Sequence, residues 1–222
     1  MGGAQPVRML RAGAPTDGVS ISRRLAACPI ALILLALGGA TPAWGAGELK
    51  FGTTPALPTL TSVTLNAKAQ TVNTTMSSFA VTDTRGTKSG WNVTVAGQSG
   101  EKKSAVFEQY CPKAKCGATA EGYVAAGQKM AANSLKLSST GASFTGGTGS
   151  APTFQCSTAC NVDSATAVTI AEAATGGAGE STWTTTGFSA TSLALTVPTT
   201  LKALPAEEVY HVNILWTLAT GP

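Results

Sequence analysis

The chain has 222 residues, a formal net charge of +4 and only 12% charged residues, about half the charged fraction of an average soluble domain. With so few charged residues, the chain is not a disordered segment kept extended by charge repulsion. The lack of clustered Lys and Arg, together with 6% aromatic residues, argues against a nucleic-acid partner. The length suits a single domain.

Residues 1–46 have the pattern of a secretory signal peptide. Four arginines precede a nearly unbroken apolar run over 25–40, and small residues follow it. This order of positive, apolar and small-residue regions is typical of exported proteins. The apolar run is shorter than the roughly 20 residues that cross a bilayer. We expect cleavage after Ala43, Gly45 or Ala46, with an uncleaved membrane anchor as the alternative.

The net charge of the mature chain is close to zero. Cleavage removes four arginines and one aspartate, so 11 basic and 10 acidic residues remain, with a net charge of +1. Charge attraction therefore cannot be the main term that binds the mature domain to an anionic wall polymer or a nucleic acid. We also expect no membrane span after signal cleavage.

Six stretches of the mature chain alternate apolar and polar residues with period two, which is typical of half-buried strands. In chain order they are 61–66, 77–84, 90–96, 165–171, 191–197 and 210–218. The last is the strongest, with five apolar side chains on one face: Tyr210, Val212, Ile214, Trp216 and Leu218. Turn-forming residues separate the stretches, and no β-α-β rhythm appears. The sequence predicts an all-β fold over 47–222, a single antiparallel sandwich or barrel-like domain.

Residues 98–160 are the least regular part of the mature chain. We interpret them as a loop-rich insertion between core strands, stapled by disulfides. The one helical pattern, at 118–133, falls within this region and is weakened by Gly122 and Gly127.

The number of cysteines is consistent with an exported protein. Cys28 leaves with the signal segment, and an even number remains in the mature chain: Cys111, Cys116, Cys156 and Cys160. In an oxidising compartment these four predict two disulfides, and three pairings are open. A zinc site is the alternative, but the C-x4-C and C-x3-C spacings differ from the paired C-x2-C of common zinc ribbons. We expect no bound metal.

The sequence offers little for catalysis. Its one histidine, His211, lies in the middle of a predicted strand, and no Gly-x-Ser-x-Gly elbow accompanies it. Glu207 and Glu208 are adjacent, so on an extended chain they point to opposite faces rather than across a cleft. No phosphate loop, His-rich cluster or calcium loop is present. We expect no catalytic residue and no cofactor; a secreted hydrolase with an unrecognised site is the alternative.

The tryptophans carry more information. Trp183 lies among hydroxyl residues from Ser181 to Thr186, which suits either an exposed stacking surface for a sugar ring or a side chain packed at a strand edge. Trp91 and Trp216 are each followed two residues later by an aliphatic residue, Val93 and Leu218. That spacing places each pair on one face of a strand.

These two motifs, one central and one near the C-terminus, resemble the WxL domain of Gram-positive cell-surface proteins. Supporting segments are Asp83-Thr84-Arg85-Gly86, Gly90-Trp91-Asn92-Val93-Thr94-Val95, the run from Tyr210 to Leu218, and Gly221-Pro222. The resemblance spans most of the mature chain and is anchored at 79–96 and 191–222. The first motif departs from the family name in having Val93 where Leu is implied.

The resemblance implies a secreted protein held non-covalently on the outer face of the wall by peptidoglycan binding, often alongside other surface proteins. A structural or adhesive protein that engages other wall or host proteins is the alternative. The motif tryptophans either build a shared core or contact glycan directly. The apolar neighbours of Trp216 favour the core.

Overall fold

The computed structural model describes residues 6–7 and 47–222 of the chain. The predicted signal peptide lies outside these residues, apart from the short strand β1 (Pro6–Val7), which pairs with β3 (Val63–Thr64). The prediction of a cleaved signal segment therefore stays a prediction.

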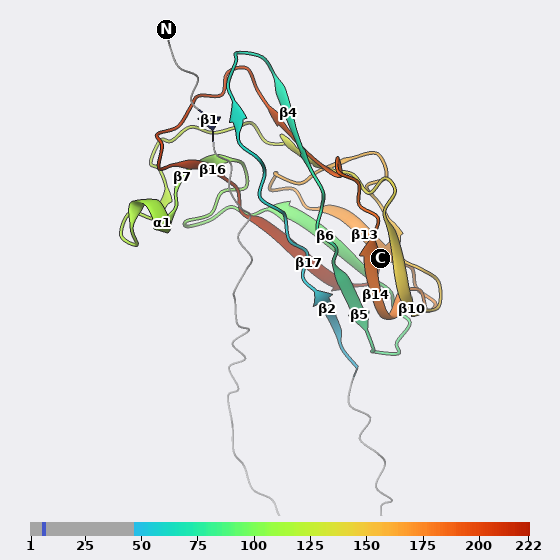
Figure 1. Cartoon of the computed structure of the whole chain (residues 1–222). Helices are drawn as coiled ribbons and strands as arrows, with labels where there is room; N and C mark the ends of the chain where they lie inside the picture. The colour runs from blue at the N-terminus through green and yellow to red at the C-terminus, as the bar shows by residue number, and fades with distance from the viewer. Residues whose placement is uncertain (1–5, 8–46) are drawn as a thin grey trace, which may run out of the picture.

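Three four-stranded sheets make up most of the described domain (Figure 1). The first sheet has the order β10 (Ser143–Thr148), β14 (Glu180–Thr186), β5 (Ala80–Asp83) and β2 (Leu49–Thr53). The second has β11 (Thr153–Phe154), β13 (Val168–Ala173), β6 (Trp91–Gly97) and β17 (Ile214–Thr220). The third has β12 (Cys160–Asn161), β9 (Leu135–Leu137), β15 (Leu193–Val197) and β4 (Gln70–Thr74).

A smaller sheet and one helical turn complete the domain. The small sheet has the order β16 (Val209–His211), β7 (Glu108–Cys111) and β8 (Gly122–Tyr123), and the helical turn is α1 (Lys113–Cys116). Figure 1 shows β7, β16 and α1 at one end of the molecule and β5, β10 and β14 at the other. All strand pairs are antiparallel and no sheet closes into a barrel within the described residues. The predicted all-β antiparallel fold is confirmed, in its sandwich form.

The first and second sheets enclose a common core. In β6 burial alternates along the strand, because side chains of an extended chain point to opposite faces in turn. Trp91, Val93 and Val95 point inward from the second sheet and meet Val81 and Phe144 from the first. The chain passes between these two sheets three times, from β5 to β6, from β10 to β11 and from β13 to β14.

The third sheet extends the same core. Its inner face carries aliphatic side chains in matched register, with Leu195 opposite both Leu135 of β9 and Val72 of β4. Asp163, fully buried, accepts hydrogen bonds from the backbone amides of Ser134 and Leu135, each 2.9 Å long. Burial disfavours its charged form and raises the pKa of Asp163 to about 6.

Each of the six predicted stretches contains a strand, but the last one is divided. β16 belongs to the small sheet and β17 to the second sheet. At the break, the amide of Asn213 donates to Ser104 and its carbonyl accepts from Gln98, so the backbone remains hydrogen-bonded as it changes sheets. The predicted inward face persists across the break, since alternate residues from Tyr210 to Trp216 are buried.

Two parts of the prediction for 98–160 are modified. The weak helical pattern at 118–133 does not form a helix: α1 ends before it, and the stretch forms turns and β8, because its two glycines and their neighbours make reversals. Residues 98–134 are loop-rich. Further along, the region supplies β9, β10 and β11 to the three main sheets. The cysteines pair locally, Cys111 with Cys116 and Cys156 with Cys160.

Candidate functional site

The two W-x-aliphatic motifs lie side by side on neighbouring strands. β6 and β17 pair so that Val93 is directly opposite Leu218, while Trp216 faces Val95 and Trp91 faces Thr220. Because the strands are antiparallel, the two motifs are related by an approximate local two-fold rotation about the Val93–Leu218 pair. The tryptophans therefore lie on either side of this central pair, on the inner face of the second sheet.

Both tryptophan side chains are buried in the core rather than exposed at the surface. Trp91 is 0% exposed and Trp216 is 9% exposed, while Leu218 is half-buried. The indole N–H of Trp91 donates to the carbonyl of Gly179 at 3.0 Å, which satisfies its only donor. Gly179 has φ 71°, and a Cβ there would fall 2.5 Å from the Trp91 nitrogen. A glycine is therefore needed for the loop to close over the ring.

A chain of aromatic rings connects the two tryptophans across the sandwich. The centroid of Trp216 lies 6.3 Å from that of Phe79, Phe79 lies 6.2 Å from Phe144, and Phe144 lies 6.2 Å from Trp91. These separations are within the range in which tilted and edge-to-face ring pairs attract. Phe144 was missed from the sequence, because the Gly, Ser and Thr around it on β10 read as a loop.

An ion pair holds the strand ends next to Trp91. Arg85 donates to both carboxylate oxygens of Asp83, at 2.9 and 2.8 Å, and this pairing lowers the pKa of Asp83. The same guanidinium donates to the carbonyl of Gly90 at 2.8 Å and to the hydroxyl of Thr220. The Asp83–Gly86 segment thereby connects the end of β5 with the start of β6 and the end of β17.

The residue between Trp91 and Val93 contributes to the same junction. Asn92 lies on the other face of β6 and donates through its side-chain amide to the carbonyl of Gly221. The amide of Gly221 in turn donates to Gly90 at 3.2 Å. The Asp83–Gly86 segment, the start of β6 and the last residues of the chain thus form one hydrogen-bonded junction beside the first motif.

Trp183 is also buried, at 6% exposed. It lies on β14 between Val81 of β5 and Gly146 of β10, and its indole N–H donates to the carbonyl of Glu180 at 2.9 Å. Gly147, at φ 63°, passes directly over the ring, and a Cβ there would lie 2.0 Å from it. The indole therefore presents no open face on which a sugar could stack, and the packed alternative describes its surroundings.

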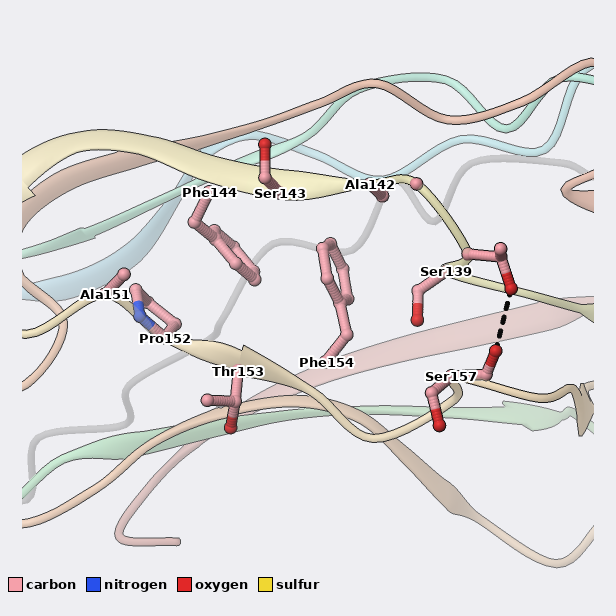
Figure 2. Close-up of a pocket in the computed structure, with 11 residues that line it drawn as sticks. Ser139, Ala142, Ser143, Phe144, Ala151, Pro152, Thr153, Phe154 and Ser157 are labelled. Atoms are coloured by element: carbon pink, nitrogen blue, oxygen red, sulfur yellow. Dashed lines mark hydrogen bonds between the residues drawn. The ribbon is translucent and has the colours of Figure 1, made fainter.

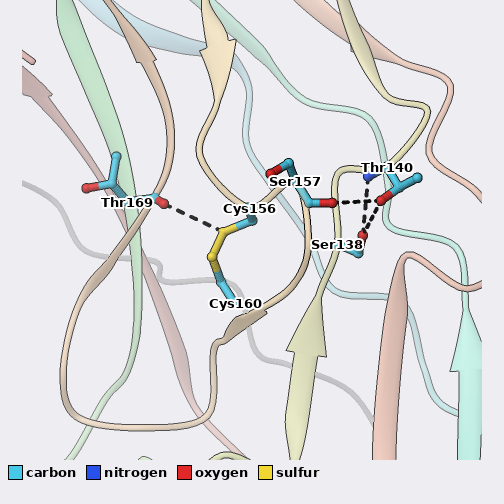
Figure 3. Close-up of a disulfide and its surroundings, with 6 residues drawn as sticks. All are labelled: Ser138, Thr140, Cys156, Ser157, Cys160 and Thr169. Carbon is cyan, nitrogen blue, oxygen red and sulfur yellow. Dashed lines mark hydrogen bonds between the residues drawn. A yellow bond between two sulfur atoms is a disulfide. The ribbon is translucent and has the colours of Figure 1, made fainter.

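The Cys156–Cys160 disulfide closes a short turn beside the end of β9 (Figure 3). Cys156 is fully buried, and its sulfur lies 3.6 Å from the Thr169 carbonyl oxygen, a contact rather than a donated bond because a disulfide sulfur carries no hydrogen. Next to it, the Thr140 hydroxyl donates to the carbonyl of Ser157 at 2.8 Å. The disulfide and this bond together fix the turn against the β9–β10 connection.

His211 belongs to a cluster of rings at the opposite end of the molecule. Its ring stacks on Tyr110 at 4.6 Å, and its Nδ1 lies 2.8 Å from the hydroxyl of Tyr123. Glu208 accepts from the side-chain amide of Gln109, and exposed Glu207 lies 3.8 Å from Lys115. The two glutamates thus have separate partners and do not face each other across a cleft.

A groove opens where the first and second sheets end. Its two sides are the edge strands β10 and β11, and it encloses about 520 Å³. Its lining is Ser139, Thr140, Gly141, Ala142, Ser143, Phe144, Ala151, Pro152, Thr153, Phe154 and Ser157. We call it the Phe154 groove, because the partly exposed Phe154 stacks on buried Phe144 with centroids 4.6 Å apart (Figure 2). Sequence patterns do not predict it, since its walls come from two segments brought together by the sheets.

Comparison with known families gives one match. The profile described as "WxL domain surface cell wall-binding" matches residues 45–222, which is most of the chain. This chain belongs to that family, and the predicted resemblance is confirmed. The family is one of cell-wall-binding domains at the cell surface, and the protein is a cell-wall surface protein.

Comparison with curated proteins found no match, and neither did comparison with solved structures. Over residues 6–7 and 47–222, the structure contains no helix long and apolar enough to cross a membrane.

Proposed function

We propose that this domain is exported through residues 1–46 and attaches its protein to the wall by binding peptidoglycan non-covalently, without catalysis. The family match over 45–222 carries the proposal, because it assigns wall binding to nearly the whole mature chain. The finer assignment to peptidoglycan rests on the chemistry of the domain.

Charge favours peptidoglycan over an anionic wall polymer as the main ligand. The mature chain has 11 basic and 10 acidic residues, so its long-range field is weak. Several charges are already paired, including Arg85 with Asp83 and Lys129 with Glu108 at 3.0 Å. A ligand bound by hydroxyls, amides and apolar ring faces, as sugars are, suits this surface better than a polyanion does.

In this proposal the motif tryptophans act through the fold. Trp91 and Trp216 have almost no exposed surface, so their contribution to wall binding is to hold β6 and β17 against the first sheet. The ion pair between buried Asp83 and partly exposed Arg85, which also bonds to Gly90 and Thr220, supports the same junction.

A pull-down on purified sacculi tests the proposal. Sacculi stripped of proteins and of anionic polymers should retain the mature protein, residues 47–222, and binding should weaken little as salt is raised. The same assay in reductant shows whether the disulfides are needed. Binding only to unstripped walls would indicate an anionic polymer, and binding only with another wall protein would favour a protein-engaging role. Released sugars or peptides would indicate a hydrolase.

A further inference from the structure

We propose that the Phe154 groove is the saccharide site of this domain and holds a neutral pyranose unit of a wall glycan. This inference rests on the proposed function and adds to it the place where the glycan binds. The groove is separate from the two W-x-aliphatic motifs, which lie on β6 and β17 rather than on the edge strands β10 and β11.

The apolar part of the groove suits the C–H face of a sugar ring. Phe144, Phe154 and Pro152 form its apolar lining, and Phe154 is the aromatic residue that remains partly exposed. Its ring is held on one side by Phe144 and approached by Phe188 at 5.6 Å. Because these neighbours fix its orientation, little side-chain freedom is lost when a ligand binds.

The polar part of the groove suits the hydroxyls of a sugar. Ser139, Thr140 and Ser157 line one end, where the Thr140–Ser157 hydrogen bond and the neighbouring disulfide fix the backbone. In Figure 2 the ring of Phe154 lies between Phe144 and this hydroxyl-bearing end. An aromatic surface next to a rigid set of hydroxyls and carbonyls can bind the apolar face and the polar edge of one pyranose together.

The absence of charge identifies the kind of ligand. The lining contains no Lys, Arg, His, Asp or Glu, so neither a phosphate-rich polymer nor a charged peptide stem would find a counter-ion there. The volume of about 520 Å³ lies within the range of about 300–1,000 Å³ typical of small-ligand sites. A lipid chain would cover the polar end of the groove without forming hydrogen bonds there, which costs free energy.

Two variants change the groove in different ways. Ala151→Arg places a long charged side chain at an exposed position of the lining and removes no packed group, whereas Phe154→Leu keeps an apolar side chain but removes the flat ring. Ala132→Arg is the matched control, since Ala132 is exposed on the turn before β9, at the opposite end of that strand from Ser139. Urea midpoints establish that each variant is folded.

Binding of each variant to stripped sacculi should be measured beside an NMR titration with tetra-N-acetylchitotetraose, a soluble neutral glycan. We expect Ala151→Arg and Phe154→Leu to bind sacculi at least about tenfold more weakly, a factor equal to about 1.4 kcal/mol, with Ala132→Arg unchanged. The glycan should shift amide signals of residues 139–144 and 151–157 in the original protein and not in the two groove variants.

The two arms separate failure of the groove from failure of the proposed function. If the original protein binds sacculi and both groove variants bind equally well, the groove proposal is overturned while wall binding stands. If the original protein does not bind sacculi, peptidoglycan binding is wrong. If, in addition, the tetrasaccharide does not shift the amide signals of residues 139–144 and 151–157, the groove proposal is overturned as well.

Discussion

Replacing Trp216 by alanine should unfold the domain rather than remove a glycan contact. The indole is 9% exposed and packs against Phe79 and beside Val95. Truncating a buried Trp to Ala costs about 3–5 kcal/mol through lost burial and the cavity left behind. That loss is a large share of the roughly 5–15 kcal/mol by which a domain is stable.

Urea denaturation followed by far-ultraviolet circular dichroism measures this loss. With a urea dependence of about 2 kcal/mol per molar, the midpoint should fall by roughly 2 M. Sacculus binding should fall in parallel with the folded fraction and recover at low temperature or low denaturant, where that fraction rises. Thr217→Ala is the matched control, because Thr217 is the next residue along β17 and is exposed on the opposite face; its midpoint should barely move.

A Trp216→Ala protein that keeps the original midpoint and yet no longer binds sacculi would contradict this prediction. Such a protein would show that the indole contacts the wall ligand directly. Trp216→Phe adds a graded test, because a smaller ring can still pack against Phe79. It should lose less stability than the alanine variant and keep its binding wherever it is folded.

Three further changes test other parts of the structure. Arg85→Met should lower the free energy of unfolding by about 3–5 kcal/mol near pH 7, measured by urea denaturation, because it leaves the Asp83 carboxylate buried without its partner. The difference in stability from the original protein should shrink as the pH falls below the lowered pKa of Asp83. Asp163 binds a proton more tightly in the folded protein, where its pKa is about 6 against the ordinary 3.8. The free energy of unfolding should therefore fall by up to about 3 kcal/mol as the pH rises from 4 to 6. Asp163→Asn should abolish this dependence of stability on pH. Replacing both Cys156 and Cys160 by serine should cost about 2 kcal/mol, as expected for so short a loop, and should remove part of the sensitivity of the melting temperature to reductant.

The junction around Trp91 brings together segments of the family resemblance that lie far apart in the sequence. The Asp83–Gly86 turn, the first motif and the C-terminal strand meet through Arg85, which bonds to Asp83, Gly90 and Thr220. An arginine is suited to this role because its planar guanidinium presents several donors in fixed directions. A lysine could not replace all of these bonds at once.

Local patterns in the sequence were enough to predict much of the fold. Alternation along 90–96 and 210–218 identified the strands with the two motifs, because a half-buried strand must place apolar side chains on every second position. It also predicted that Trp216 belongs to the core. It did not identify β10 and β14, whose Gly- and Thr-rich sequences resemble loops until a neighbouring sheet buries one face.

The sequence by itself determined the strand faces, the family and the even set of cysteines, because each depends on residue type and short-range spacing. The tertiary structure alone decided that Val93 lies opposite Leu218, that the cysteines pair locally, and that Phe144 and Phe154 line one groove. Those features depend on contacts between segments far apart in the chain. Only the packing of the sheets brings such segments together.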